Sequence, residues 1–569
     1  MYNLTLLYEE TEHNLEKAFY WYQIAAKRDD VKAQYNLAHC YENGKGTEKN
    51  LEKAIYWHQI AAKRDHVNAQ CYLAHFYKNG KGTEKNLEKA IYWYLKAAKN
   101  GNISAIYNLA LLYSEEKNLE ESFYWYQIAA KKDHINAQYN LACCYYDGKG
   151  TDKNLEKAFY WFQKAAENGN KHAMYTLACL YNNGGKEIEK NLEKAFYWFQ
   201  KAAEKDHINA QSDLAHVYKN GKGTEKNLEK AFYWFQKAAE NGSEFAIYNL
   251  ACLYDDGEGT EKNLEKAFYW YQKAAEKNGN KIAQHNLASL YYSGKGTERN
   301  LEKAFYWYQK AAENGHENAM HNLACLYNHG EGTEMNSEKA FYWNQKAAEK
   351  DHIDAQCSLA YLYKNGKGTE KNLEKAFYWY QKAAEKDHID AQCNLAYLYK
   401  NGKGTEENLE KAFYWYQKAA ERNSINAQYN LARLNSEGTE KNLEKAFYWY
   451  QKAAENNDKY AMNNLAVCYN NGEGTEKNFE KAFYWYQKAA EMDHIDAQYY
   501  LARLYDNGQG TERNLEKAFY LYQKAAEKNQ IKAQYNLACI YYAGEVIEKN
   551  LEKSFYWYQR AAEGGNTNA

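Results

Sequence analysis

The stretch AQYNLACCYYDGKGTDKNLEKAFYWFQKAAE, residues 137–167, decides the fold, because close copies of it fill the chain of 569 residues. Aligned on its tryptophan, 16 copies follow one another at steps of about 36 residues. A period of that length is typical of a solenoid, in which each repeat stacks on its neighbours. Leu521 takes the tryptophan position in one copy, and the others carry Trp21, Trp57, Trp93, Trp125, Trp161, Trp198, Trp234, Trp270, Trp307, Trp343, Trp379, Trp415, Trp449, Trp485 and Trp557.

Each copy holds two amphipathic segments, which we call helix A and helix B. In helix A, counting Ala137 as position 0, apolar residues at positions 0, 4, 5, 7 and 8 share one face of a helix of 3.6 residues per turn. Gly148 follows the last of them, where a left-handed cap is expected. Helix B begins after Asn154, the expected N-cap, and Glu156 in its first turn suits the helix dipole. The pattern therefore predicts two helices per repeat.

The composition excludes several classes of protein. The chain has no proline, and its 20 Phe, 59 Tyr and 15 Trp make it too apolar to be disordered. Its 73 basic and 75 acidic residues leave no electrostatic footprint for nucleic acid. No apolar run of about 18 residues is present, so we expect no membrane insertion, and the start does not resemble a signal peptide. Together with the odd number of cysteines, these features favour a cytoplasmic protein.

The repeat resembles a known family, the Sel1-like repeat, which is related to the tetratricopeptide repeat. The pattern that carries the resemblance is A-x-x-x-L-A-x-x-Y-x-x-G-x-G-T-x-x-N-x-x-K-A-x-x-W-x-x-K-A-A-E. This chain has Ala where the family often has Gly, as at Ala142 and Ala251, and Asn at the start of helix B where the family has Asp. The resemblance implies an all-α, right-handed superhelical solenoid of about 16 repeats that acts as an adaptor. We expect one continuous array over residues 1–569, with a truncated first repeat at 1–30 and fifteen further repeats at 31–569.

Positions 2 and 3 of helix A face away from the predicted core. In similar tetratricopeptide arrays, helix A lines a concave groove in which Asn side chains bind the backbone of a partner segment. An amide offers a donor and an acceptor together, and Tyr adds rigid contact area; the alternative is that these Asn residues are only solvated helix positions. The candidate groove residues are Asn36, Asn108, Asn140, Asn249, Asn286, Asn322, Asn394, Asn430, Asn464, Asn536, Tyr35, Tyr107, Tyr139, Tyr248, Tyr429 and Tyr535. The expected partners are other proteins or extended peptide segments.

A tyrosine directly before the helix-B tryptophan, such as Tyr160, recurs in all sixteen repeats among polar neighbours. One interpretation places it over the aliphatic stems of neighbouring lysines on the convex side. The other is an aromatic stripe that binds a partner.

No residue pattern indicates catalysis, a cofactor or a metal site. The cysteines lie only in helix A and suit small buried positions. A ladder of histidines three residues before helix A supplies one ligand per repeat, too far apart for zinc: His66, His134, His207, His316, His352, His388 and His494. The G-K-G-T loops, as at 221–224, lack the adjacent Lys-Thr of a phosphate loop and are expected to end helices.

The sequence thus favours a non-enzymatic scaffold or adaptor. One alternative is an accessory or regulatory subunit of a membrane enzyme or of a protein-degradation complex, as some similar proteins are. Another is a hydrolase of the kind suggested for cysteine-rich relatives. Neither end of the sequence carries a polar capping repeat, and Leu4, Leu7, Phe555 and Trp557 are expected at the terminal faces. We therefore expect either a longer polypeptide or end-to-end self-association.

Overall fold

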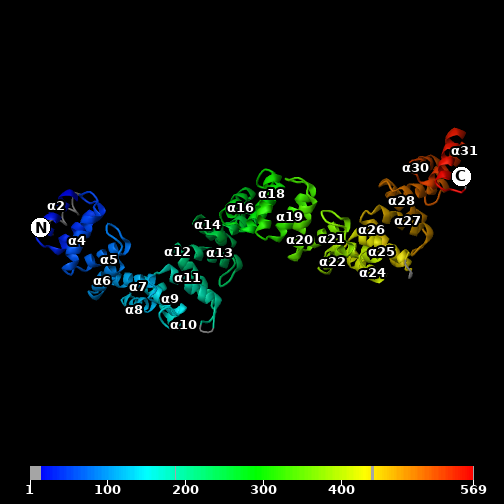
Figure 1. Cartoon of the computed structure of the whole chain (residues 1–569). Coiled ribbons are helices and arrows are strands. Elements are labelled where there is room, and N and C mark those ends of the chain that lie inside the picture. Colours follow the sequence, from blue (N-terminus) through cyan, green and yellow to red (C-terminus); the bar gives the residue numbers. More distant parts are fainter. Residues whose placement is uncertain (1–14, 186–187, 438–440, 568–569) are drawn as a thin grey trace. The chain divides into compact units, whose positions relative to one another are not determined.

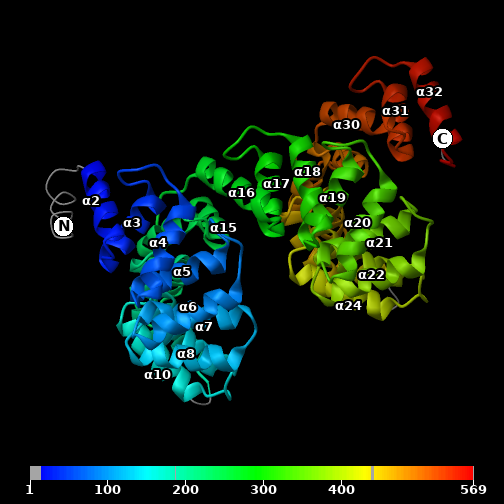
Figure 2. The same cartoon turned by 60° about the vertical axis from the view of Figure 1, so that its left-hand side comes forward.

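Pairs of antiparallel helices follow one another through the computed structural model, which describes residues 15–185, 188–437 and 441–567 (Figures 1 and 2). The chain divides into two compact units, Met1–Asn278 and Gly279–Ala569. The described part of the first unit contains α2 (Leu15–Lys27), α3 (Val31–Asn43), α4 (Leu51–Lys63), α5 (Val67–Asn79), α6 (Leu87–Lys99), α7 (Ile103–Glu115), α8 (Leu119–Lys131), α9 (Ile135–Asp147), α10 (Leu155–Glu167), α11 (Lys171–Asn183), α12 (Leu192–Glu204), α13 (Ile208–Asn220), α14 (Leu228–Glu240), α15 (Glu244–Asp256) and α16 (Leu264–Asn278).

The described part of the second unit is built in the same way. It contains α17 (Lys281–Ser293), α18 (Leu301–Glu313), α19 (Glu317–His329), α20 (Ser337–Glu349), α21 (Ile353–Asn365), α22 (Leu373–Glu385), α23 (Ile389–Lys400), α24 (Leu409–Glu421), α25 (Ile425–Glu437), α26 (Leu443–Glu455), α27 (Lys459–Asn471), α28 (Phe479–Glu491), α29 (Ile495–Asn507), α30 (Leu515–Glu527), α31 (Ile531–Ala543) and α32 (Leu551–Glu563). Odd-numbered helices are helix A and even-numbered helices are helix B, so the prediction of two helices per repeat is confirmed.

The predicted helix ends are confirmed in the repeat at residues 135–170. Asn154 caps α10, because its side chain accepts a hydrogen bond from the backbone N–H of Lys157 at 2.8 Å. Gly148 closes α9 in the left-handed conformation with φ of 76°, and its N–H donates to the Cys144 carbonyl. These local bonds fix where each helix begins and ends.

The core also lies where the periodicity places it. Ala137, Leu141 and Ala142 of α9 are fully buried, and Cys144 and Tyr145 are nearly so. On α10 the buried residues are Ala158, Phe162, Ala165 and Ala166. Small alanines at most contact positions let neighbouring helices approach closely, while one aromatic side chain on most B helices fills the space between them. The buried side chains thus form successive clusters along the repeats of each unit.

The second glycine of the A–B loop has a role beyond ending a helix. At Gly150, with φ of 71°, a Cβ would lie less than 3.0 Å from the carbonyl oxygen of Leu119, the first residue of the preceding helix B. The same close approach recurs along the chain, for example between Gly332 and Leu301. This glycine therefore allows one repeat to seat its loop directly against the backbone of the repeat before it.

The histidine ladder caps the A helices. In each of the seven cases, the Nδ1 atom accepts a hydrogen bond from the backbone N–H three residues later, at 3.1–3.2 Å. An imidazole can do this only while Nδ1 carries no proton. Burial accordingly lowers the pKa of His207 and of His316 to about 4.

Candidate partner-binding surface

The helix-A surface carries all the residues that the sequence proposed for a groove. Each of the ten Asn and six Tyr side chains is half-buried. Where the next repeat has a histidine cap, the Tyr ring at position 2 stacks on it, as Tyr107 does on His134 with ring centroids 4.3 Å apart. Other position-2 rings pack against the aromatic residue of helix B, as Tyr248 does on Tyr271 at 6.2 Å. Position 2 is therefore partly occupied by ring contacts within the chain, and the exposed part of each half-buried ring is what a partner could contact.

Several of the Asn amides already make one hydrogen bond within the chain. Asn36 Nδ2 donates to the Tyr22 hydroxyl at 3.2 Å, and Asn140 Nδ2 donates to Tyr107 at 3.4 Å. Asn249 and Asn430 instead donate to backbone carbonyls one turn earlier, at 2.8 Å in both cases. An amide has four hydrogen-bonding positions, so one internal bond leaves capacity for a partner. These bonds also orient the amides.

Two hollows open on the helix-A surface of the second unit. One of about 380 Å³ runs over α19–α25, and its lining includes Asn344, Cys357, Tyr361, Tyr380 and Asn394. The other, of about 400 Å³, is lined by Tyr292, Tyr308, Asn322, Cys325, Leu326, His329 and Glu331. Cys325 and His329 belong to both linings, so the two hollows adjoin. The structure thus brings the predicted residues Asn322 and Asn394 to one hollowed region.

The first hollow coincides with a departure from the repeat. Residue 344 is Asn, whereas the equivalent position is Tyr308 one repeat earlier and Tyr380 one repeat later. Asn344 is 4% exposed, and its Oδ1 lies 2.9 Å from His321 Nδ1. Because an amide is much smaller than a phenol ring, the space that an aromatic side chain fills elsewhere stays open here. The signal in the sequence is that an alignment of the repeats shows Asn at this position between two tyrosines.

The hollow is polar but carries little charge. The Tyr380 hydroxyl is buried there without a hydrogen-bond partner. Burial raises the pKa of Cys357 to about 12 and also raises that of Cys393, so both thiols stay protonated. Protonated thiols are poor nucleophiles, so these two cysteines contribute hydrogen-bonding and apolar surface to the hollow.

The tyrosines before the tryptophan lie on the helix-B surface, and all sixteen are about half exposed, from 48% to 60%. Their rings pack edge-on against the neighbouring Trp, as in Tyr342–Trp343 at 5.1 Å. In several repeats the lysine four residues on lies over the ring, as Lys346 does over Tyr342 at 5.8 Å. In these repeats the tyrosine thus contacts a neighbouring lysine, as one of the two interpretations expected, but through the ammonium group as a cation–π contact rather than along the aliphatic stem.

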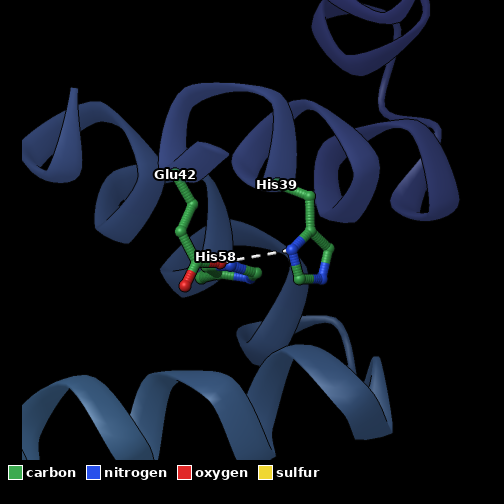
Figure 3. Close-up of side chains that lie close together, drawn as sticks. All are labelled: His39, Glu42 and His58. Atoms are coloured by element: carbon green, nitrogen blue, oxygen red, sulfur yellow. Dashed lines mark ion pairs between the residues drawn. The ribbon is translucent and has the colours of Figure 1, made fainter. Parts of the chain in front are cut away.

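Among the described residues, the structure brings together one group of side chains that could hold a metal ion. His39, Glu42 and His58 offer ligand atoms that all lie within 4.8 Å of one another (Figure 3). Reasoning from the histidine ladder misses this group, because His39 and His58 lie outside the ladder. The available signal is that residue 58 is His where most repeats have Tyr or Phe.

All eleven cysteines are free thiols, three of them buried and eight half-buried. Within residues 15–185, 188–437 and 441–567, no helix combines the length and apolar character needed to span a bilayer. Leu4 and Leu7 lie outside the described residues, Phe555 is 71% exposed, and Trp557 is half-buried.

Comparison with known proteins identifies the repeat. The Sel1 repeat matches at residues 2–30, 31–66, 67–102, 103–134, 135–170, 171–207, 208–243, 245–279, 281–316, 318–352, 353–388, 389–424, 425–458, 459–494, 495–530 and 531–566. The search of curated proteins gave no match. Among solved structures, a protective antigen of uropathogenic Escherichia coli strains with an SLR fold is 32% identical. That match covers 78% of this chain and 94% of the antigen, with a TM-score of 0.68.

A Sel1 repeat protein from Oxalobacter formigenes is 28% identical, and the match covers 54% of this chain and 89% of that protein, with a TM-score of 0.45. The resemblance read from the sequence is confirmed by the repeat matches, which fall in both units. Since the Sel1 repeat matches from residue 2 to residue 566 with few interruptions, this chain belongs to the Sel1 repeat family, as an all-α solenoid of sixteen repeats.

Proposed function

We propose that this chain is a non-enzymatic scaffold that binds extended segments of other proteins along its helix-A surface. Sel1 repeat proteins typically serve as scaffolds for protein interactions, and the sequence shows the repeat throughout. The observation that carries the proposal is the hollowed region of the second unit. Asn394 lines one hollow together with the Tyr380 hydroxyl, which is buried without a partner, and Asn322 lines the adjoining hollow. A peptide backbone has one hydrogen-bond donor and one acceptor per residue, so it can donate to or accept from the Asn amides and the tyrosine hydroxyl.

The absence of strong charge in the hollow fits the same kind of ligand. Lys364 donates to Asn394 Oδ1 at 3.2 Å, and burial lowers the pKa of this lysine. Asp390 is the acidic residue of the lining. A neutral extended segment would contact the amides and the Tyr361 ring without leaving an unpaired buried charge.

The experiment uses the full chain and a display library of unstructured peptide segments. The affinity of the recovered segments is measured by fluorescence anisotropy for the wild-type chain and for Asn344→Tyr. This variant fills the hollow with the side chain that neighbouring repeats carry. Asn322→Ala and Asn394→Ala should each weaken binding roughly threefold to tenfold, from about 0.5–1.5 kcal/mol per hydrogen bond.

The matched control is Tyr342→Ala, which lies on the same helix as Asn344 but on the exposed helix-B surface. Binding that survives Asn344→Tyr and is lost in Tyr342→Ala would move the interaction surface to the helix-B tyrosines. It would refute the helix-A assignment.

A further inference from the structure

The second repeat, residues 31–66, differs from the others at the point where helix A meets helix B. In other repeats, positions 6 and 9 of helix A approach the tip of the buried aromatic side chain on helix B. Tyr271 donates to Cys252 at 3.5 Å and to Asp255 at 3.4 Å, and the Ser289 and Tyr308 hydroxyls lie 2.9 Å apart. The fold itself therefore brings these three positions together.

In the second repeat the same three positions are His39, Glu42 and His58. His39 and Glu42 extend from adjacent turns of α3, and the His58 ring reaches them from α4 (Figure 3). The repeats at 67–102 and 208–243 also have His at position 6, but they carry Lys at position 9 and an aromatic residue on helix B. In this chain the combination of two imidazoles and a carboxylate therefore occurs only here.

Three buried polar atoms of this group lack hydrogen-bond partners. His58 is fully buried, and neither of its ring nitrogens has a hydrogen-bond partner. Glu42 Oε2 is also buried without a hydrogen bond, and its contact is the His39 Nδ1 atom at 3.2 Å. Buried nitrogen and carboxylate atoms without partners are costly, and an ion is one of the features that account for them.

We propose that His39, Glu42 and His58 bind one divalent transition-metal ion, with zinc as the ion the donor set fits best. Two imidazoles and a carboxylate are a zinc donor set, and bonds of about 2.0–2.2 Å place neighbouring ligand atoms roughly 3.3–3.6 Å apart in a tetrahedron. The Nδ1–Oε2 separation of 3.2 Å lies near the short end of that range. The third ligand atom lies within 4.8 Å of both, so a small side-chain rotation closes the set.

Aromatic side chains hold the two imidazoles in place. The Tyr72 ring stacks on His58 with centroids 5.6 Å apart and meets His39 edge-on at 4.6 Å. Tyr35 also packs edge-on against His39 at 4.6 Å, and its ring lies 6.1 Å from that of Tyr72. Packing of this kind orients the ligands before the ion arrives, which reduces the entropy lost on binding.

The site has an open side. The His39 and Glu42 side chains are 24% and 26% exposed, whereas the His58 side chain is fully buried. Three protein ligands with solvent access leave the fourth position of the ion to water or to a group from another molecule. The ion would also tie α3 to α4 within the second repeat.

The test adds Zn²⁺ to the metal-free full chain and measures binding by calorimetry with a competing chelator. The key variant is His58→Tyr, because Tyr22 and Tyr94 occupy the equivalent position in the flanking repeats and the fold accepts that residue. The control is His216→Ser, which removes a position-6 histidine from a repeat whose helix B carries Phe235.

We expect the wild-type chain to bind one more tight Zn²⁺ than His58→Tyr, and His216→Ser to match the wild type. Glu42→Gln should weaken that site more than the roughly hundredfold that loss of an outer-shell partner costs. Hydrogen exchange supplies the second measurement, since Zn²⁺ should slow exchange in α3 and α4 of the wild type but not of His58→Tyr. Equal stoichiometry and affinity in the wild type and His58→Tyr, or an equal change in exchange, would overturn the proposal.

Discussion

Replacing Gly332 by alanine should loosen the stacking of two repeats more than the same change at Gly330 does. The two glycines lie in one loop and have almost the same backbone conformation, with φ of 69° and 70°. An alanine in this left-handed region costs roughly 1–2 kcal/mol at either position. The glycines differ in what a new Cβ would meet.

At Gly330 the nearest atom to a Cβ is the Met335 nitrogen, at 3.4 Å, which is close to an ordinary contact. At Gly332 a Cβ would lie less than 3.0 Å from both the carbonyl carbon and the carbonyl oxygen of Leu301, which belong to the backbone of α18. A helix backbone cannot rotate away as a side chain can, so the two repeats must separate. Overpacking of this kind costs about 1–3 kcal/mol more.

Hydrogen exchange of the full chain is the suitable assay, because unfolding of a long repeat array is not described by a single free energy. Gly332→Ala should lower the opening free energy of α18 and α20 by about 2–5 kcal/mol, and Gly330→Ala by about 1–2 kcal/mol. Equal effects of the two substitutions would show that the second glycine serves only backbone conformation, and that the loop does not press against the preceding repeat.

Two further predictions concern pH and an unpaired acceptor. A histidine whose pKa is lower in the folded than in the unfolded state contributes stability that is present above pH 6.5. This stability is lost as the pH falls toward the pKa of the folded state, which is about 4 for His316. Protonation removes its cap on α19, so hydrogen exchange at the start of α19 should speed up by the equivalent of about 1 kcal/mol between pH 6.5 and 4. His316→Asn keeps a cap that does not titrate, so an exchange profile that is the same in this variant would contradict the prediction. Gln356 Oε1 is buried without a partner, whereas Asn314 donates to the equivalent Gln284 at 3.0 Å. Lys386→Asn should supply that donor and stabilise the local stacking by about 0.5–1 kcal/mol, measured by hydrogen exchange. The substitution removes the exposed Lys386–Asp351 ion pair, which contributes little. A loss of stability in this variant would refute the prediction.

The sequence alone determined the repeat, its two helices and their ends. Caps such as Asn154 and Gly148, and the face that carries Ala137 and Leu141, depend on residues three or four positions apart. Interactions over such short separations are set by helix geometry itself, so they can be read from one copy of the pattern. The position of the proposed groove residues on helix A followed from the same periodicity.

Only the tertiary structure decided how the repeats use the irregular positions. The hollow beside Asn344, the approach of Gly332 to Leu301 and the meeting of His39 with His58 join residues of different helices and loops. Their geometry depends on how closely one helix packs on the next, which is set by the small side chains of the whole stack rather than by any single segment. An Asn or His in place of a buried aromatic therefore has no visible consequence in sequence, and becomes a hollow or a set of ligands only when the neighbouring helices are in place.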